Sequence, residues 1–188
     1  MGAVLTLEPR DYTLADLDTI PDDGMQRELV DGMLLVTPAP LAIHQRAVFK
    51  LGFKLQLVCP DDLEIFSAPF HYRPTSERSL QPDLLVCHPE DVGARWIEKP
   101  LLLAVEVLSP STRMKDLLLK RGVYEQAGVA SYWLFDPETE VLTVLELSDG
   151  RYVERAIVKA DDVFEAELPF PVRIVPAELV RPAKRSAA

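Results

Sequence analysis

The stretch KPLLLAVEVLSPSTRMKDLLLKRGVYEQAG, residues 99–128, carries one charge where none is expected. Seven of the eight residues from Leu101 to Leu108 are apolar, which predicts a buried strand, and the exception is Glu106. Side chains alternate across a strand, so Glu106 shares one face with apolar residues while the other face is apolar throughout. We therefore expect a central strand that is covered on both sides and has a carboxylate inside it.

A carboxylate in that position needs compensation, because burying it unpaired costs several kcal/mol. A buried basic residue, a raised pKa that keeps the acid neutral, or a bound metal ion would each provide it. The next segment predicts a helix with Ser111 or Thr112 as its N-cap and Gly128 at its end. Lys120 lies on or beside the core-facing side of this helix, so its ammonium group is able to reach Glu106.

A second acid, Asp83, opens the preceding apolar run, directly after Pro82. If the two strands pair antiparallel, Asp83 and Glu106 lie side by side near one end of the sheet. Together with the backbone carbonyl of Val107 they form an all-oxygen site suited to Mg²⁺ or Mn²⁺. Lys120 would then orient a water and stabilise charge on a phosphate. A Glu106–Lys120 salt bridge, with Asp83 as a turn residue, explains the spacing equally well.

The remaining pattern predicts a mixed α+β fold. Asp31-Gly32 and Asp149-Gly150 each separate two apolar stretches, which is typical of β-hairpins. Between Pro40 and Pro60 the apolar residues recur at helical spacing, at Leu41, Val48, Leu51, Leu55 and Val58. The chain of 188 residues suits one domain, 1–188, with its core at about 25–160 and its last few residues frayed.

Composition excludes several classes of protein. The formal net charge of -10 argues against binding nucleic acid by bulk attraction, although a local basic face stays compatible with it. No apolar run approaches the roughly 20 residues that span a bilayer, so we expect no membrane segment. Cys59 and Cys87 share no metal-binding spacing, and we expect both as free thiols in a reducing cytoplasm.

Three stretches together resemble a known family: RELVDGMLLVTPAPLAIHQR, QPDLLVC, and AVEVLSPSTRMKDLLLKRGVYEQAGVASYWLFDP. They are similar to the Uma2 family, also called DUF820, of the PD-(D/E)XK or restriction endonuclease-like superfamily. The resemblance extends from about Glu28 to Tyr152. It implies an αβββαβ core with a central mixed sheet flanked by helices, here with extra hairpins at the N-terminal and C-terminal ends.

The resemblance also implies roles for single residues. Asp83 corresponds to the acid of the P-D motif and Glu106 to the second acid. The superfamily pattern places a lysine two residues after the second acid, where this chain has Leu108, and the Uma2-like pattern carries that lysine on the next helix, as Lys120. Glu28 matches a further acidic position that would ligate a second metal or support the first; an exposed strand acid is the alternative.

Four more residues are candidates for substrate binding. His44 and Gln45 open the long helix and would lie near the substrate phosphate, or His44 would be a surface or capping residue. Arg113 and Lys115 flank the predicted site and, with Arg121, would form a local basic rim for nucleic acid. An ordinary solvated helix face explains these three cations as well.

The sequence therefore predicts a cytoplasmic endonuclease, dependent on Mg²⁺ or Mn²⁺, that hydrolyses phosphodiester bonds of DNA and forms a homodimer. The alternative is a nuclease fold kept as a binding or assembly module without turnover. The net charge of -10 and the displaced lysine favour that alternative.

Overall fold

The computed structural model describes residues 11–21, 23–109, 113 and 115–182, without the side chains of Lys115 and Asp116. Its helical segments are α1 (Leu14–Thr19), α2 (Ala42–Gln56), the 3₁₀ turn η1 (Pro89–Asp91), the π-helical turn η2 (Lys115–Lys120), α3 (Arg121–Gln126) and α4 (Pro176–Val180). Its strands are β1 (Gln26–Val30), β2 (Met33–Thr37), β3 (Glu64–Ser67), β4 (His71–Thr75), β5 (Arg78–Leu80), β6 (Leu84–Cys87), β7 (Trp96–Ile97), β8 (Leu103–Val107), β9 (Ser131–Asp136), β10 (Val141–Ser148), β11 (Arg151–Lys159), β12 (Phe164–Ala166) and β13 (Val172–Ile174).

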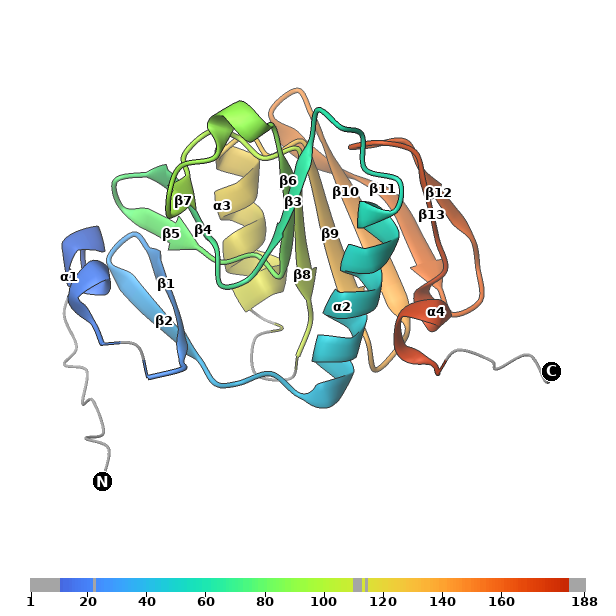
Figure 1. The fold of residues 1–188 in the computed structure, drawn as a ribbon, viewed down its shortest axis with the longest axis horizontal. Coiled ribbons are helices and arrows are strands. Elements are labelled where there is room, and N and C mark those ends of the chain that lie inside the picture. Colours follow the sequence, from blue (N-terminus) through green and yellow to red (C-terminus); the bar gives the residue numbers. More distant parts are fainter. Residues whose placement is uncertain (1–10, 22, 110–112, 114, 183–188) are drawn as a thin grey trace.

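A six-stranded sheet with the order β11-β10-β9-β8-β6-β3 forms the centre of the fold (Figure 1). Strands β8 and β9 are parallel, and every other neighbouring pair in this sheet is antiparallel. Because parallel strands need a crossover, η2 and α3 connect β8 to β9. The expected mixed α+β architecture is confirmed, and so is the antiparallel pairing of the strand after Asp83 with the strand of Glu106.

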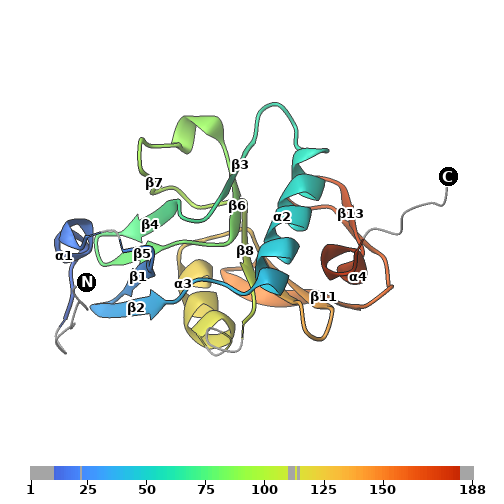
Figure 2. The same cartoon turned by 60° about the horizontal axis from the view of Figure 1, so that its bottom comes forward.

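Helices cover both faces of this sheet, with α2 on one side and α3 on the other (Figure 2). Val105 and Val107 of β8 point into the core beneath α2, whereas Ala104 packs in the core that contains Tyr124 of α3. The alternation places Glu106 on the α3 face. As expected, the strand is buried on both sides, and Glu106 is only 3% exposed.

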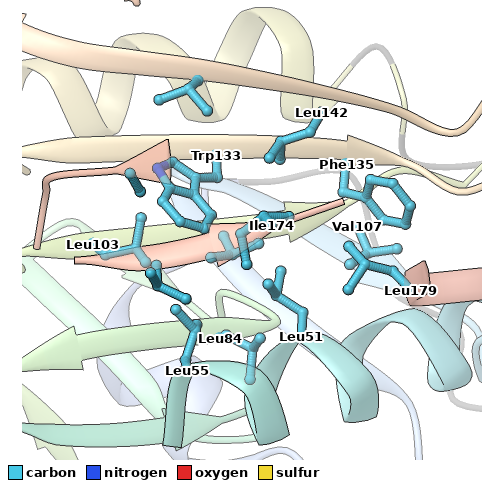
Figure 3. Packing of buried hydrophobic residues seen from close by; sticks show 14 of the residues in the cluster. Leu51, Leu55, Leu84, Leu103, Val107, Trp133, Phe135, Leu142, Ile174 and Leu179 are labelled. Atoms are coloured by element: carbon cyan, nitrogen blue, oxygen red, sulfur yellow. The ribbon is translucent and has the colours of Figure 1, made fainter. Parts of the chain in front are cut away.

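The inner side of α2 packs on the sheet, where Leu51 and Leu55 meet Leu84 and Trp133 lies further in (Figure 3). The buried residues of α2 recur at helical spacing: His44, Ala47, Leu51 and Leu55. The expectation that Leu41 and Val58 share this face is wrong. The helix spans only Ala42–Gln56, so both residues lie beyond its ends, and both are exposed.

A second sheet, with the order β2-β1-β5-β4-β7, lies on the α3 side of the molecule (Figures 1 and 2). Its β1–β2 hairpin turns at Asp31-Gly32, whose φ angles are 48° and 85°. The β10–β11 hairpin turns at Asp149-Gly150, with φ angles of 51° and 74°. Two positive φ angles are what a tight hairpin turn requires, which explains the Asp-Gly pairs and confirms both predicted hairpins.

Other expectations have mixed outcomes. Cys59 and Cys87 are free thiols, as expected. Among the helices of the described ranges, none has the length and apolarity needed to cross a bilayer. The predicted N-cap at Ser111 or Thr112 and the frayed C-terminal end lie outside the described residues.

The packing of α2 predicts an asymmetric response to leucine truncation. Leu51→Ala removes a fully buried side chain and should lower the free energy of unfolding by about 2–5 kcal/mol. Leu118→Ala, the matched change at an exposed leucine, should stay within about 0.5 kcal/mol of the wild type. Urea unfolding followed by circular dichroism measures both. A loss below about 1 kcal/mol for Leu51→Ala would contradict the packing of α2 on the sheet.

Candidate active site

Lys120 lies between two buried carboxylates. Its Nζ atom is 2.9 Å from Oε1 of Glu28 and 3.0 Å from Oε1 of Glu106. The three side chains come from β1 of the second sheet, from β8 of the central sheet, and from the junction of η2 and α3. None of the three is more than 5% exposed, so the compensation that Glu106 needs comes from a buried cation.

Two further donors reach these carboxylates. Tyr124 lies four residues after Lys120, on the same side of the helix, and its hydroxyl donates to Oε1 of Glu106 at 2.8 Å. Burial and the nearby Glu106 raise the pKa of Tyr124 well above its usual value, so the phenol keeps its proton and donates. The backbone N–H of Gln81 donates to Oε1 of Glu28 at 2.8 Å. Each carboxylate therefore accepts from Lys120 and from one further donor.

Asp83 stands next to the end of β8. Its Oδ2 atom accepts the backbone N–H of Val107 at 2.7 Å and lies 3.2 Å from Nε2 of His44. In an extended strand the N–H and C=O of one residue point to the same side, so the Val107 carbonyl also faces the edge where Asp83 lies. The structure thus brings together Asp83, the Val107 backbone and the base of the Glu106 side chain, as the pairing of the two strands predicts.

A cavity of about 820 Å³ collects the candidate residues. Its lining includes Glu28, His44, Gln45, Asp83, Glu106, Val107 and Lys120. His44 and Glu28 are buried, which excludes a surface histidine and an exposed strand acid as their environments.

The predicted basic rim is not part of this cavity. Arg113 is not among the lining residues; its Nη1 atom is 2.6 Å from Oδ2 of Asp136, at the end of β9. The prediction for Lys115 lies outside the described side chains. Arg113 thus pairs with an acid outside the cavity lining, and the roles of Arg113 and Lys115 in substrate binding stay predictions.

The donors present fit a cation that takes few protein ligands. Among the described residues, no three His, Cys, Asp or Glu side chains converge closely enough to hold a metal ion. Mg²⁺ accepts one or two carboxylates and keeps several waters, so Asp83, Glu106 and the Val107 carbonyl suffice for it. Oδ1 of Asp83 has no hydrogen-bond partner within the described ranges. Oε1 of Glu28 is engaged by Lys120 and Gln81, just as Oε1 of Glu106 is by Lys120 and Tyr124, so a ligating and a supporting role for Glu28 both stay predictions.

Two of these contacts were not predicted. Tyr124 has no predicted role at the site, although its spacing of four from Lys120 is a signal for a shared partner. The backbone N–H of Gln81 has no sequence signal at all, because its contact with Glu28 depends on the pairing of β1 with β5, which ends just before Gln81. The Gln81 side chain in turn lies with Nε2 3.0 Å from Nε2 of His71. Burial lowers the pKa of His71, so this imidazole is neutral near pH 7.

Comparisons with known proteins agree with the resemblance. The sequence pattern of the Uma2 family, described as "Putative restriction endonuclease", matches residues 14–178. Among solved structures, the chain is similar to a "putative nuclease belonging to DUF820" from Anabaena variabilis, with a TM-score of 0.73 and 16% identity. The similarity covers 90% of this chain and 97% of that chain, and it confirms the expected fold class. No curated protein matches the chain.

The buried cluster predicts a strong effect of removing its cation. Lys120→Met leaves Glu28 and Glu106 buried without their ammonium partner and should lower the free energy of unfolding by about 3–5 kcal/mol. Adding Glu28→Gln and Glu106→Gln should recover much of that loss, because a buried charge cluster replaced as a whole is often close to neutral. Chemical denaturation of the three proteins measures both changes.

Lys159→Met, at an exposed lysine on β11, is the matched control and should change stability by about 0.5 kcal/mol or less. If Lys120→Met is as mild as the control, the two carboxylates do not depend on this ammonium.

Proposed function

This chain belongs to the Uma2 family, and from that premise we propose that it is a metal-dependent endonuclease that hydrolyses phosphodiester bonds of DNA. The family description and the fold shared with a DUF820 structure support a nuclease-like function. The observation that carries the finer proposal is the meeting of Asp83, Glu106 and the Val107 backbone at a cavity that also contains Lys120.

Each residue has a distinct part in this proposal. Asp83, Glu106 and the Val107 carbonyl hold Mg²⁺ or Mn²⁺, which when bound acidifies a water and polarises the phosphoryl oxygen. Lys120 holds Glu106 in place and supplies the positive charge that orients the attacking water and stabilises the phosphate. Glu28 holds Lys120 in position through an ion pair, and His44 of α2 holds Asp83 in position through its Nε2 atom.

The remaining site residue is Gln45. It is exposed on the first turn of α2 and lines the cavity, where it would contact the substrate phosphate by hydrogen bonds from its amide. The free thiols agree with the reducing cytoplasm as the compartment of this enzyme.

A second function is favoured by two observations. The ammonium of Lys120 is already shared by two carboxylates, and the formal net charge of the chain is -10. Both features weaken attraction for a phosphate, so a nuclease fold that binds or assembles without turnover is the alternative. The two functions differ in whether any DNA is cut.

Metal binding and cleavage test the proposal together. Purified protein should bind Mn²⁺ in calorimetric titration and nick plasmid, single-stranded or branched DNA when Mg²⁺ or Mn²⁺ is added. Asp83→Asn keeps an acceptor for the Val107 N–H but removes a ligand charge, so it should abolish the heat of Mn²⁺ binding and reduce cleavage about 100-fold or more. Glu106→Gln should behave in the same way.

Glu165→Gln, an exposed acid on β12 outside the cavity, is the control and should retain both properties. Cleavage that persists in Asp83→Asn would place the chemistry elsewhere. Absence of cleavage on all three DNA substrates, with folded protein and both metals, would favour the inert module.

A further inference from the structure

The outer side of α2 carries a row of exposed large apolar side chains. Phe49, Phe53 and Leu57 follow one another at intervals of four residues and are 75%, 57% and 66% exposed. Leu41, eight residues before Phe49 and just ahead of the helix, is 59% exposed. We call Leu41, Phe49, Phe53 and Leu57 the α2 stripe. It is about 24 Å long, since each helical residue advances 1.5 Å.

The exposed apolar area of the stripe is larger than that of single apolar residues scattered on a surface. The two phenylalanines alone leave roughly 200–330 Å² of side chain exposed. With the two leucines the stripe reaches the several hundred Å² at which exposed apolar patches mark interaction sites. In Figure 1, no other described element is drawn over α2.

We propose that the α2 stripe is the interface through which two copies of this chain form a symmetric dimer. In a two-fold symmetric dimer both copies use the same surface: if residue i of one copy contacts residue j of the other, residue j of the first copy contacts residue i of the second. Phe49 and Phe53 lie one turn apart on the side of α2 opposite the buried residues Ala47, Leu51 and Leu55, so both rings can face one partner helix. Antiparallel helices would place the Phe49 and Phe53 rings of the two copies against one another near the axis, with Leu41 and Leu57 toward the rim of the contact. Side chains four residues apart also form the ridges of common helix–helix contacts.

Charge around the stripe is complementary in the same antiparallel arrangement. The first turn of α2 has no acidic residue of its own and no side-chain cap, and its backbone N–H groups favour negative charge nearby. Asp61, Asp62 and Glu64 follow the other end of the helix and are exposed. Antiparallel pairing brings the N-terminal end of each α2 to the acidic segment of its partner.

Other occupants fit the stripe less well. A membrane-surface helix presents cations on its polar face, but Lys50 and Lys54 of α2 are bonded to Glu178 of α4. Nucleic acid would stack on the phenylalanines only with a basic surface beside them, which acids 61, 62 and 64 oppose. A stable interface buries about 800 Å² on each partner, so the stripe would be its apolar centre within a polar rim.

The dimer would also bear on the site cavity. Leu41 belongs to the stripe and, like Gln45, lines the cavity. The second copy would therefore lie close to the part of the cavity wall that Leu41 and Gln45 form.

Sedimentation equilibrium of the full chain tests the interface without any reference to nuclease activity. The wild type at about 100 μM should be a dimer. Phe49→Glu, at the centre of the stripe, should raise the dimer dissociation constant about thirty-fold or more, as expected for a central aromatic contact. Because Phe49 is exposed in the monomer, circular dichroism should show an unchanged fold.

Val153→Glu, at a residue of similar exposure on the edge strand β11, is the matched control and should remain dimeric. A wild type that is monomeric at that concentration would overturn the proposal. So would a dimer that survives Phe49→Glu, and loss of the dimer in Val153→Glu alone would assign the interface to the β11 edge instead.

Discussion

The rest of the site depends on one buried ammonium group. Lys120 contacts Glu28 of one sheet and Glu106 of the other, so a single cation joins two sheets and the helix between them. Burying these charges carries a large desolvation cost, which only good geometry and further hydrogen bonds offset. Tyr124 and the Gln81 N–H provide those bonds. The cluster is therefore held by specific donors and leaves little freedom to its carboxylates.

The balance of charge at this end of the cavity has a chemical consequence. The carboxylates of Glu28, Asp83 and Glu106 line the cavity with the ammonium of Lys120, and Asp18, Arg27 and Arg95 line the same cavity. Carboxylate oxygens are the ligands that a hard divalent cation takes. In the function proposed for the chain, the acid buried in β8 would hold such a cation beside Lys120.

One helix connects the core, the site and the outer surface. The inner residues of α2 pack on the central sheet, and His44 on its first turn reaches Asp83. Its outer side carries the exposed phenylalanines Phe49 and Phe53. A displacement of α2 would change both the sheet packing and the position of His44, so a partner bound on the outer side would act directly on the geometry beside Asp83.

The sequence by itself determined the local features and the strand that matters most. Apolar alternation identified β8 as a buried strand, the Asp-Gly pairs located both hairpins, and the positions of Asp83 and Glu106 on neighbouring strand ends predicted their meeting. These inferences succeed because strand periodicity and turn geometry act over a few residues. The placement of Lys120 toward Glu106 followed from helical spacing in the same way.

Only the tertiary structure decided which distant residues complete the site. Glu28 reaches Lys120 because β1 of the second sheet lies against η2 and α3, and Arg113 turns to Asp136 rather than to the cavity. The exposed apolar side chains on the outer side of α2 were also not foreseen. Apolar residues follow the same helical spacing whether the helix face that carries them is covered by a sheet or open to solvent. Contacts between elements far apart in the chain depend on sheet order and packing, and no spacing along the sequence records them.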